Sequence, residues 1–381
     1  MKEVKKKPIQ VLHIVGRMNT GGIETWLINV VKHLPSEGYR FDFFAISSEE
    51  GRLDEAVFAL GCRFLRGSQK RPSVTSLLKD LRKVVSQNGP YDVIHSHVHH
   101  FSGIILLIGF LLRIPVRIAH SHTDTRSKEN REGFLRRLYV ELMRFCVRVF
   151  ANRGIGVSSL AAEDQFGLDW KKDKRWVLLP CGIDLDQFDI LQDNVVKEML
   201  GIPGRAKVIG HVGRFDKPKN HMFLADVFKN LIDRGNDLFL VLVGEGPLMP
   251  DFRQRVSDLG LIDKVIFLGI RNDVPKILIS VVDVFVFPSL YEGLGLAFVE
   301  AQLAGCYCVG SDVLPREVVV EPDQISLLSL RDPLEIWAGR IENYLERAPV
   351  KATRSPRRDQ GSLYDFSTHV KKLIHCYRSI S

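Results

Sequence analysis

Three short stretches of the sequence combine residue types that can hold phosphate or sugar hydroxyl groups. The first follows an apolar run at residues 9–15 and contains the paired glycines Gly21 and Gly22 ahead of a helical pattern. Paired glycines let the backbone approach a ligand closely, and the start of a helix offers unpaired N–H groups to an anion. An ordinary strand-to-helix turn has the same composition, so this stretch alone is weak evidence.

The second stretch places two cations after the apolar run at residues 208–212. Arg214 and Lys219 stand on the loop that follows this run. Arginine supplies a planar fork of donors and lysine a point charge, a combination that suits a diphosphate. One basic residue at such a position is best explained as a solvated loop residue, but two favour an anion site.

The third stretch, residues 287–305, is the most specific. An apolar strand leads into a glycine-containing loop that carries Glu292, and an apolar helix with Glu300 near its start follows. The first N–H groups of that helix can bind phosphate, while a carboxylate can accept two ribose hydroxyls. Because an otherwise apolar helix gives Glu300 no partner, a binding role is favoured over a carboxylate satisfied inside the core.

Histidines gather after two further apolar runs, in residues 95–100 and 120–122. His-x-His pairs at strand spacing place their side chains on one side of a sheet, as in some metal sites. No Asp, Glu or Cys stands beside them at a recognised ligand spacing, so we predict no metal. Polar contacts to a ligand are favoured, with His122 and Thr123 as the candidates, and the other imidazoles are expected to be structural.

The elements that must position these residues alternate between strand and helix patterns. The alternation predicts two doubly wound parallel α/β domains, whose ligands lodge beyond the carboxyl ends of the strands. Residues 1–183 should form the first domain and 184–347 the second, with residues 348–381 as a linker and a returning helix. The expected strands are residues 9–15, 40–46 and 91–95 in the first domain, and 208–212, 238–243, 265–268, 282–287 and 307–311 in the second.

Length and composition exclude several classes of protein. The 381 residues, 45% hydrophobic and 26% charged, exclude global disorder and a disulfide-stapled miniature. Six scattered cysteines without a CxxC spacing predict buried thiols in a reducing compartment. The most apolar stretch, residues 103–112, is shorter than the ~20 residues that a membrane span needs, so we expect a buried helix and a cytoplasmic protein.

Positive charge is concentrated in the first half of the chain. Residues 1–183 carry 29 Lys and Arg against 18 Asp and Glu, a net charge of +11, and residues 184–381 carry 24 against 27, a net charge of −3. Such asymmetry favours an anionic partner for the first half. No aromatic-interleaved basic platform appears, so a nucleic acid is not expected and an acidic membrane surface is the better candidate.

A basic amphipathic helix is predicted for residues 134–150. Arginines and one glutamate occupy one side, and the other side is apolar, formed by Leu135, Leu138, Leu142, Phe145 and Val149. The simpler interpretation is that the apolar side packs on the protein's own sheet. The sharper one is that the helix lies in an anionic membrane interface.

In chain order, these motifs resemble those of the family 4 glycosyltransferases, in particular their exopolysaccharide-synthesis branch. The resemblance extends over about residues 10–312 and rests on Gly21-Gly22-x-Glu24, His122-Thr123, Gly182-Ile183-Asp184, Gly213-Arg214 with Lys219-Asn220, Gly244-Glu245-Gly246-Pro247, and the pair Glu292 and Glu300. One departure is the domain junction, which often reads Pro-Asn-Gly in the family but is Pro180-Cys181-Gly182 here.

The resemblance implies a GT-B fold, with two Rossmann-like domains facing a central cleft and a C-terminal helix returning to the first domain. It implies a retaining transferase that needs no metal or other cofactor. The donor would be a nucleotide-diphosphate sugar, with a UDP-sugar expected, and the second domain would hold it. The acceptor, held by the first domain, would be a glycan or lipid-linked glycan in extracellular or capsular polysaccharide biosynthesis, at the inner face of the plasma membrane.

Roles for individual residues also follow from the resemblance. The catalytic set would be Arg214 and Lys219 on the diphosphate, Glu292 on the transferred sugar and His122 beside that sugar. Glu300 would bind the ribose, and Ile270 and Arg271 would border the base. The remaining donor-binding residues would be Gly21, Gly22, Thr123, Gly293, Leu294, Gly295 and Leu296.

Two other functions remain open from the sequence. A nucleotide-sugar epimerase shares the fold and would convert its substrate without an acceptor, but no acid/base set for that chemistry is identifiable. A non-catalytic or NAD-binding Rossmann protein is the second alternative. Against it, neither first-strand loop carries G-x-G-x-x-G with an acidic residue about twenty positions on.

Overall fold

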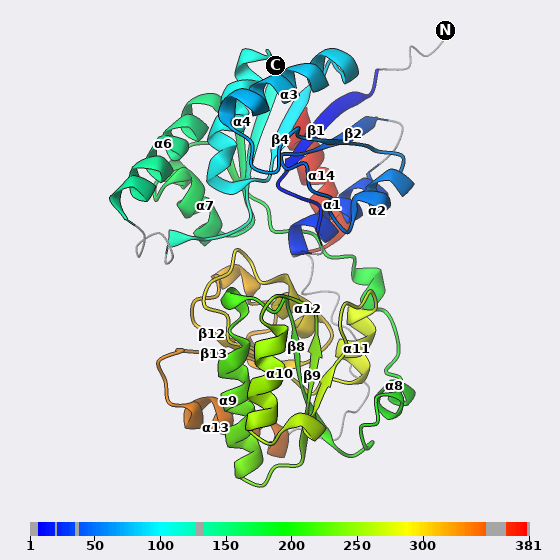
Figure 1. The fold of residues 1–381 in the computed structure, drawn as a ribbon. Helices are drawn as coiled ribbons and strands as arrows, with labels where there is room; N and C mark the ends of the chain where they lie inside the picture. The colour runs from blue at the N-terminus through cyan, green and yellow to red at the C-terminus, as the bar shows by residue number, and fades with distance from the viewer. Residues whose placement is uncertain (1–6, 20, 35–37, 127–132, 348–362, 379–381) are drawn as a thin grey trace. The chain divides into compact units, whose positions relative to one another are not determined.

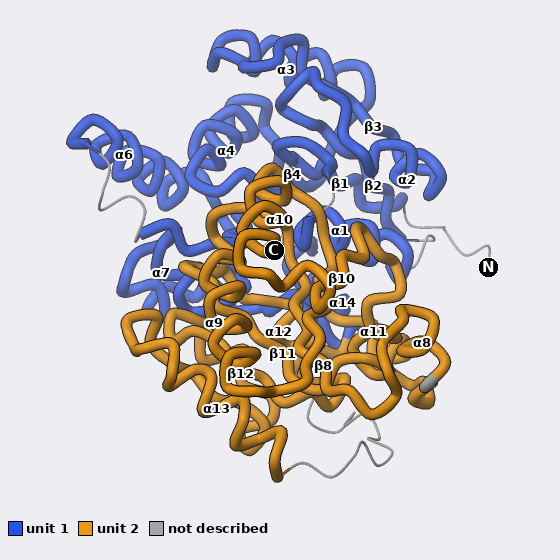
Figure 2. Tube along the Cα trace, turned by 60° about the horizontal axis from the view of Figure 1, so that its bottom comes forward, with its two compact units in different colours: residues 1–182, 366–381 blue, residues 183–365 orange. Residues whose placement is uncertain are grey.

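The computed structural model describes residues 7–19, 21–34, 38–126, 133–347 and 363–378 (Figure 1). The chain divides into two compact units, which Figure 2 colours separately. Unit 1 comprises residues 1–182 together with 366–381, and unit 2 comprises residues 183–365. Most of the predicted linker, residues 348–362, lies outside the described residues.

Unit 1 is built on a parallel sheet that has seven strands within the described residues, in the order β3-β2-β1-β4-β5-β6-β7. Its strands are β1 (Ile9–Val15), β2 (Tyr39–Ala45), β3 (Arg63–Arg66), β4 (Val93–Ser96), β5 (Val116–Ser121), β6 (Arg153–Gly156) and β7 (Trp176–Leu178). Apolar runs such as that of β1 form strands covered on both faces, as parallel sheets require. The order reverses between β1 and β4, which makes this the topological switch point of the sheet.

Helices cover both faces of the unit 1 sheet. They are α1 (Gly22–His33), α2 (Asp54–Ala59), α3 (Val74–Asn88), α4 (Ser102–Leu111), α6 (Phe134–Phe150), α7 (Ser159–Phe166) and α14 (Phe366–Tyr377). Leu12 and Ile14 of β1 point to a core built with α3, α4 and α6. The opposite face carries His13 beneath α1 and α14, which contact each other. The returning C-terminal helix, red in Figure 1, therefore packs on the first domain as predicted.

Unit 2 repeats the plan with a parallel sheet in the order β10-β9-β8-β11-β12-β13. Its strands are β8 (Lys207–Val212), β9 (Leu238–Val243), β10 (Val265–Phe267), β11 (Val284–Phe287), β12 (Tyr307–Ser311) and β13 (Ile325–Leu328). Its helices are α8 (Asn194–Met199), α9 (His221–Asp233), α10 (Met249–Asp258), α11 (Val274–Ser280), α12 (Leu296–Leu303) and α13 (Leu334–Arg347). The switch point lies between β8 and β11.

These two parallel α/β units confirm the predicted fold class. Each predicted strand range overlaps a strand, with later starts for β4 at Val93 and β11 at Val284, but β3, β5, β6, β7 and β13 lie outside the predicted ranges. Tyr91 follows Pro90, and the Val282 N–H donates to the Ile277 carbonyl in the turn that ends α11. Asp92 and Asp283 still bond to the neighbouring strands, since Asp92 N donates to Gln10 O and Asp283 N donates to Val208 O, both at 2.9 Å. The apolar stretch at 103–112 forms α4, which begins one residue earlier and has a buried face, as expected. No helix among the described residues is both long and apolar enough to cross a bilayer.

Candidate functional site

The predicted donor residues of unit 2 all follow strands at the carboxyl edge of its sheet. Arg214 and Lys219 follow β8, Ile270 and Arg271 follow β10, and Glu292 follows β11. Because β8 and β11 are neighbours at the switch point, their loops meet there. The backbone N–H of Leu290 donates to the Pro218 carbonyl at 2.7 Å, which ties the two loops together.

Lys219 and Glu292 meet directly across the switch point. The Lys219 Nζ lies 2.5 Å from Glu292 Oε1 and 4.6 Å from the centre of the Phe287 ring. Ser289 donates its hydroxyl to the same carboxylate oxygen at 2.8 Å. Both charged side chains are mostly buried, so the pair is held in one geometry. An ammonium group carries three donors, which leaves two for a ligand.

Arg214 is exposed, and its guanidinium has no hydrogen-bond or ion-pair partner among the described residues. Its neighbour Phe215 is buried and anchors the loop, since its N–H donates to Glu245 O at 3.0 Å and its carbonyl accepts from Leu248 N at 3.0 Å. Gly246 permits this contact, because a Cβ there would lie 2.4 Å from the Phe215 carbonyl oxygen. A fixed loop thus carries a cation whose donors face solvent.

Helix α12 begins at the same edge. Gly295 caps it with φ +87°, a left-handed conformation that favours glycine, and leaves the first N–H groups of the helix without side-chain caps. The preceding Gly293 and Leu294 are buried, and Leu296 is partly exposed. This is the geometry that an anion needs at a helix N-terminus.

Glu300 lies on the second turn of α12, partly exposed, with no hydrogen-bond partner among the described residues. Burial raises the pKa of its carboxyl to about 7. A carboxylate with both oxygens available is suited to a pair of hydroxyl groups, and ligand hydroxyls would favour its ionised form.

Arg271 and Ile270 lie at the outer end of this edge. Ile270 is 41% exposed, and Arg271 makes a bidentate pair with Asp273 at 2.8 and 2.7 Å. The pair is well exposed, and hydrogen bonding to Asp273 raises the pKa of Arg271. These two residues therefore present an apolar side chain beside a guanidinium face.

The predicted residues of unit 1 lie at the carboxyl ends of β1 and β5. Gly21 and Gly22 form the start of α1, and a Cβ on Gly21 would lie 2.5 Å from a carboxylate oxygen of Glu24. His122 and Thr123 follow β5 and are partly exposed. The Thr123 carbonyl oxygen lies 3.2 Å from His99 Nε2.

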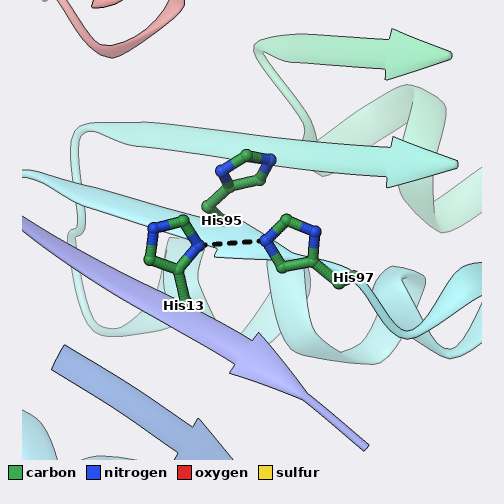
Figure 3. Close-up of side chains that lie close together, drawn as sticks. All are labelled: His13, His95 and His97. Atoms are coloured by element: carbon green, nitrogen blue, oxygen red, sulfur yellow. Dashed lines mark hydrogen bonds between the residues drawn. The ribbon is translucent and has the colours of Figure 1, made fainter. Parts of the chain in front are cut away.

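Five imidazoles lie together on the α1 and α14 side of the unit 1 sheet: His13 on β1, His95 and His97 on and after β4, and His120 and His122 on and after β5. His13 and His95 are paired across β1 and β4, and Figure 3 shows them converging with His97. Nitrogen pairs at 3.0–3.1 Å link His13 to His97, His97 to His122, and His95 to His120. Burial lowers the pKa of His13 and of His122 to about 3, so both are neutral near pH 7.

Three groups in unit 1 have enough nitrogen or oxygen ligands in reach of one another for a metal ion: His13 with His95 and His97, His97 with His120 and His122, and His99 with His100 and Asp164. The first two are formed by imidazoles alone, and these rings make the hydrogen bonds to other histidines given above. In the third, Asp164 already accepts from Arg144 at 2.5 Å and from the Thr125 N–H at 2.7 Å. The short contacts within each group are hydrogen bonds between its members or to neighbouring residues.

The sequence did not single out three residues that shape these sites. Ser289 and Phe287 hold the Lys219 and Glu292 pair, and Trp26 packs its ring against His120 and His122 at 5.1 and 5.6 Å. Trp26 also donates to His369 of α14 at 3.1 Å. The position of Trp26 on the inner face of a predicted helix could have indicated its contact with the sheet. The contacts of Lys219 could not be predicted in this way, because they depend on loop geometry.

Residues 20–187 match the family described as Glycosyltransferase Family 4, and residues 206–347 match Glycosyl transferases group 1. EpsF of Bacillus subtilis (strain 168), assigned as a glycosyltransferase, is 32% identical over 97% of this chain and 96% of its own. This chain belongs to the family 4 glycosyltransferases. Within the family, the UDP-Gal:alpha-D-GlcNAc-diphosphoundecaprenol alpha-1,3-galactosyltransferase of Escherichia coli is 28% identical over 84% of each chain.

A solved structure of a protein from Anabaena, Alr3699/HepE in complex with UDP and glucose, is similar to this glycosyltransferase in fold. It superposes with a TM-score of 0.80 at 18% sequence identity, covering 96% of this chain and 98% of the other. This likeness supports the GT-B fold of the family 4 enzyme.

Proposed function

We propose that this glycosyltransferase moves a sugar from a UDP-sugar to a glycan or lipid-linked glycan in extracellular or capsular polysaccharide biosynthesis. Unit 2, up to about residue 347, holds the donor, and unit 1 binds the acceptor. The observation that carries the proposal is the arrangement at the unit 2 switch point, where Arg214, Lys219 and the start of α12 supply fixed donors to one anion.

The proposed chemistry breaks the bond between the anomeric carbon and the distal phosphate oxygen. Negative charge then develops on the departing diphosphate, and Arg214, Lys219 and the N–H groups at residues 293–296 neutralise it without a divalent cation. The acceptor hydroxyl attacks from the same face and gives its proton to the departing phosphate oxygen, so configuration is retained. Glu292 holds the transferred sugar and also orients Lys219.

Further donor contacts follow from the position of each residue. Glu300 accepts two ribose hydroxyls, and Ile270 and Arg271 border the base. In unit 1, Gly21, Gly22 and Thr123 are proposed to bind phosphate or sugar, and His122 is proposed to contact the sugar. The relatives support this choice of substrate, since the Anabaena structure contains UDP and glucose, and the E. coli enzyme is named for UDP-Gal and a diphosphoundecaprenol-linked acceptor.

A panel of nucleotide sugars tests the proposal, with hydrolysis, transfer and thermal stabilisation as readouts. We expect a UDP-sugar to stabilise the protein and to be turned over in the presence of a chelator. Conversion of the sugar nucleotide to its epimer without acceptor would instead identify an epimerase. Binding of NADH with quenching of its fluorescence, and none of UDP, would identify a dinucleotide-binding protein.

The surface of α6 supports a membrane-linked acceptor. The predicted apolar side does not pack on the sheet, so the simpler interpretation was wrong: Leu135 is 79% and Phe145 61% exposed, and Leu138, Leu142 and Val149 are exposed as well. The helix instead packs on α4 through the narrow face of Val140, Met143 and Val147. Gly103 permits this, because a Cβ there would lie 2.7 Å from the Met143 carbonyl oxygen.

We infer that this exposed side docks on an anionic bilayer. A contiguous apolar stripe of this kind is unusual on a soluble surface, and here it continues to Phe110 and Leu111 at the end of α4, where Phe110 packs on Phe150. Arginines on the same helix and the net charge of +11 on residues 1–183 suit acidic lipid headgroups. Such a position would bring unit 1 to a lipid-linked acceptor.

A further inference from the structure

Three imidazoles of unit 1 form a single hydrogen-bonded chain that ends at the proposed sugar contact. His13 Nδ1 lies 3.0 Å from His97 Nε2, and His97 Nδ1 lies 3.0 Å from His122 Nε2. The first of these links is the dashed line in Figure 3. His13 is fully buried and His122 is partly exposed, so the chain runs from the core of the unit to its surface.

Each ring in this chain is neutral, because burial lowers the pKa of His97 well below its usual value and that of His13 and His122 to about 3. A neutral imidazole has one N–H and one bare nitrogen. Three such rings in series therefore have only two arrangements, with all hydrogen bonds donated toward His122 or all donated toward His13.

The buried end of the chain distinguishes the two arrangements. His13 Nε2 is buried without a hydrogen-bond partner among the described residues, and the rings of Phe41 and Phe43 pack against its imidazole. Donation toward His13 would leave an N–H on this atom, whereas donation toward His122 leaves only a lone pair. A buried N–H without an acceptor is rarer and costlier than a buried acceptor without a donor.

We propose that His13 and His97 act as positioning residues that hold His122 in the tautomer with hydrogen on Nδ1. His13 Nδ1–H donates to His97, and His97 Nδ1–H donates to His122 Nε2. The Nδ1 atom of His122 has no partner among the described residues, so it is the nitrogen available to a ligand. His122 thus presents a fixed hydrogen-bond donor.

The use of that donor rests on the proposed function, in which His122 contacts the transferred sugar. A neutral N–H donor recognises a sugar hydroxyl oxygen and does not add a charge next to the reacting carbon. The tautomer itself is a property of unit 1 and is measurable without any substrate. We call this chain of hydrogen bonds from His13 through His97 to His122 the relay. Its failure is therefore distinguishable from failure of the proposed function.

Two-bond ¹H–¹⁵N correlation spectra of histidine-labelled protein near pH 7.5 test the proposal, with His122→Gln assigning the signal. We expect His122 to carry its hydrogen on Nδ1 in the wild-type protein. In His97→Leu, which removes the donor to Nε2, the signal should move toward the Nε2–H form. In His97→Asn, whose amide nitrogen occupies the place of Nδ1, the Nδ1–H form of His122 should persist.

Activity gives the second readout. With a UDP-sugar substrate, His97→Leu should lower kcat/KM about tenfold, and His97→Asn should stay within about threefold of wild type, as loss or retention of one hydrogen bond predicts. His100→Asn, a buried histidine change outside the chain, is the control and should leave the tautomer of His122 unchanged.

Hydrogen on Nε2 of His122 in the wild-type protein would overturn the relay and leave the glycosyltransferase proposal intact. An unchanged tautomer in His97→Leu would overturn it too, because His97 would then not control His122. Should His97→Leu not fold, the wild-type tautomer and the His97→Asn variant still decide the matter.

Discussion

The two units share one topology but place different chemistry at the same point of it. In each sheet the order reverses between the first strand and the fourth, and polar residues gather at that edge. In unit 1 these are neutral imidazoles linked to one another. In unit 2 they are an exposed arginine, the Lys219 and Glu292 pair, and a helix start that has no side-chain cap among the described residues. The topology fixes where a site lies, and the side chains decide whether it holds charge.

The contrast is sharpest at the histidine that each first strand carries at its fifth position. His13 of β1 shares a hydrogen with another imidazole, whereas His211 of β8 has Nδ1 2.8 Å from the Val286 carbonyl oxygen. A carbonyl can only accept, so His211 Nδ1 must carry the hydrogen and no relay extends beyond it. Burial lowers the pKa of His211 to about 4, so it remains neutral beside Lys219. In unit 2 the hydrogen bond of the first-strand histidine therefore ends at a backbone carbonyl, whereas in unit 1 it leads to two further imidazoles.

The largest expected effect comes from removing the cations of unit 2. Arg214→Ala and Lys219→Ala should each lower kcat by about 10²–10³, the amount typical of a group that stabilises charge developing in the transition state. Arg255→Ala, which removes an exposed arginine paired with Asp226 in the same unit, is the matched control. Turnover is measured with a UDP-sugar, and circular dichroism melting checks the fold. Near-normal turnover in both Arg214→Ala and Lys219→Ala would show that unit 2 does not supply the charge that stabilises the departing diphosphate.

The next largest effect is expected in the pH dependence of UDP affinity, which should depend on Glu300. Ribose hydroxyls favour the ionised carboxylate, so UDP affinity should rise with pH through about 7, by about tenfold, and stay flat in Glu300→Gln. Titration calorimetry from pH 5.5 to 8.5 measures this. A wild-type curve as flat as that of the glutamine variant would show that Glu300 does not contact the nucleotide.

The same carboxyl gives a stability prediction of opposite sign. Because its folded pKa is raised, Glu300 contributes stability that is fully present below the unfolded value near 4.5 and is lost as pH rises through about 7. Without ligand, Glu300→Gln should therefore gain in Tm relative to wild type between pH 5 and 8. A Tm difference independent of pH would contradict the raised pKa.

A smaller effect is expected on binding to lipid vesicles, which should depend on α6 of unit 1 and not on unit 2. Leu142→Ser with Phe145→Ser should reduce binding to vesicles containing anionic lipid several-fold, because side chains lying in the interface gain only a fraction of the about 1.5–3 kcal/mol that full transfer from water provides. Met199→Ser in unit 2, which changes an 81% exposed side chain, is the control and should have no effect. Equal binding of all three proteins, or binding that is the same on neutral vesicles, would count against docking through α6.

The smallest effect is expected at Arg271. Its exposed pair with Asp273 already uses two of its donors, so Arg271→Ala should weaken UDP binding by no more than about threefold. A loss of a hundredfold would mean that Arg271, not Arg214, is the principal cation of the site.

The sequence predicted the fold better than the contacts inside the sites. Apolar runs such as 238–243 and 307–311 became strands with the same ends, because continuous hydrophobicity is what a doubly covered parallel strand requires. The expected location of α12 and the glycine at its start also follow from residue types alone. Strands β3, β6, β7 and β13 were not predicted, and β3, with arginine at both ends, carries no such signal.

Side-chain partners were less predictable because they depend on loops and on distant segments. From the sequence, Lys219 was expected to bind the diphosphate and Glu292 the transferred sugar. In the structure the two side chains also form an ion pair with each other. Most of the clustered histidines were expected to be structural, but His13, which strand register brings beside His95, was not named. The apolar side of α6 was expected to pack, and only the positions of α4 and α7 explain why a narrower face does so instead.

Protein cations at the carboxyl edge of unit 2 are expected to hold a nucleotide diphosphate without a divalent metal ion. Calorimetric titration of UDP in the presence of excess chelator tests it most directly. We predict that the wild-type protein binds UDP equally well with and without Mg²⁺, and that Arg214→Ala with Lys219→Ala abolishes binding. Binding that requires Mg²⁺, or that survives in the double variant, would contradict the account.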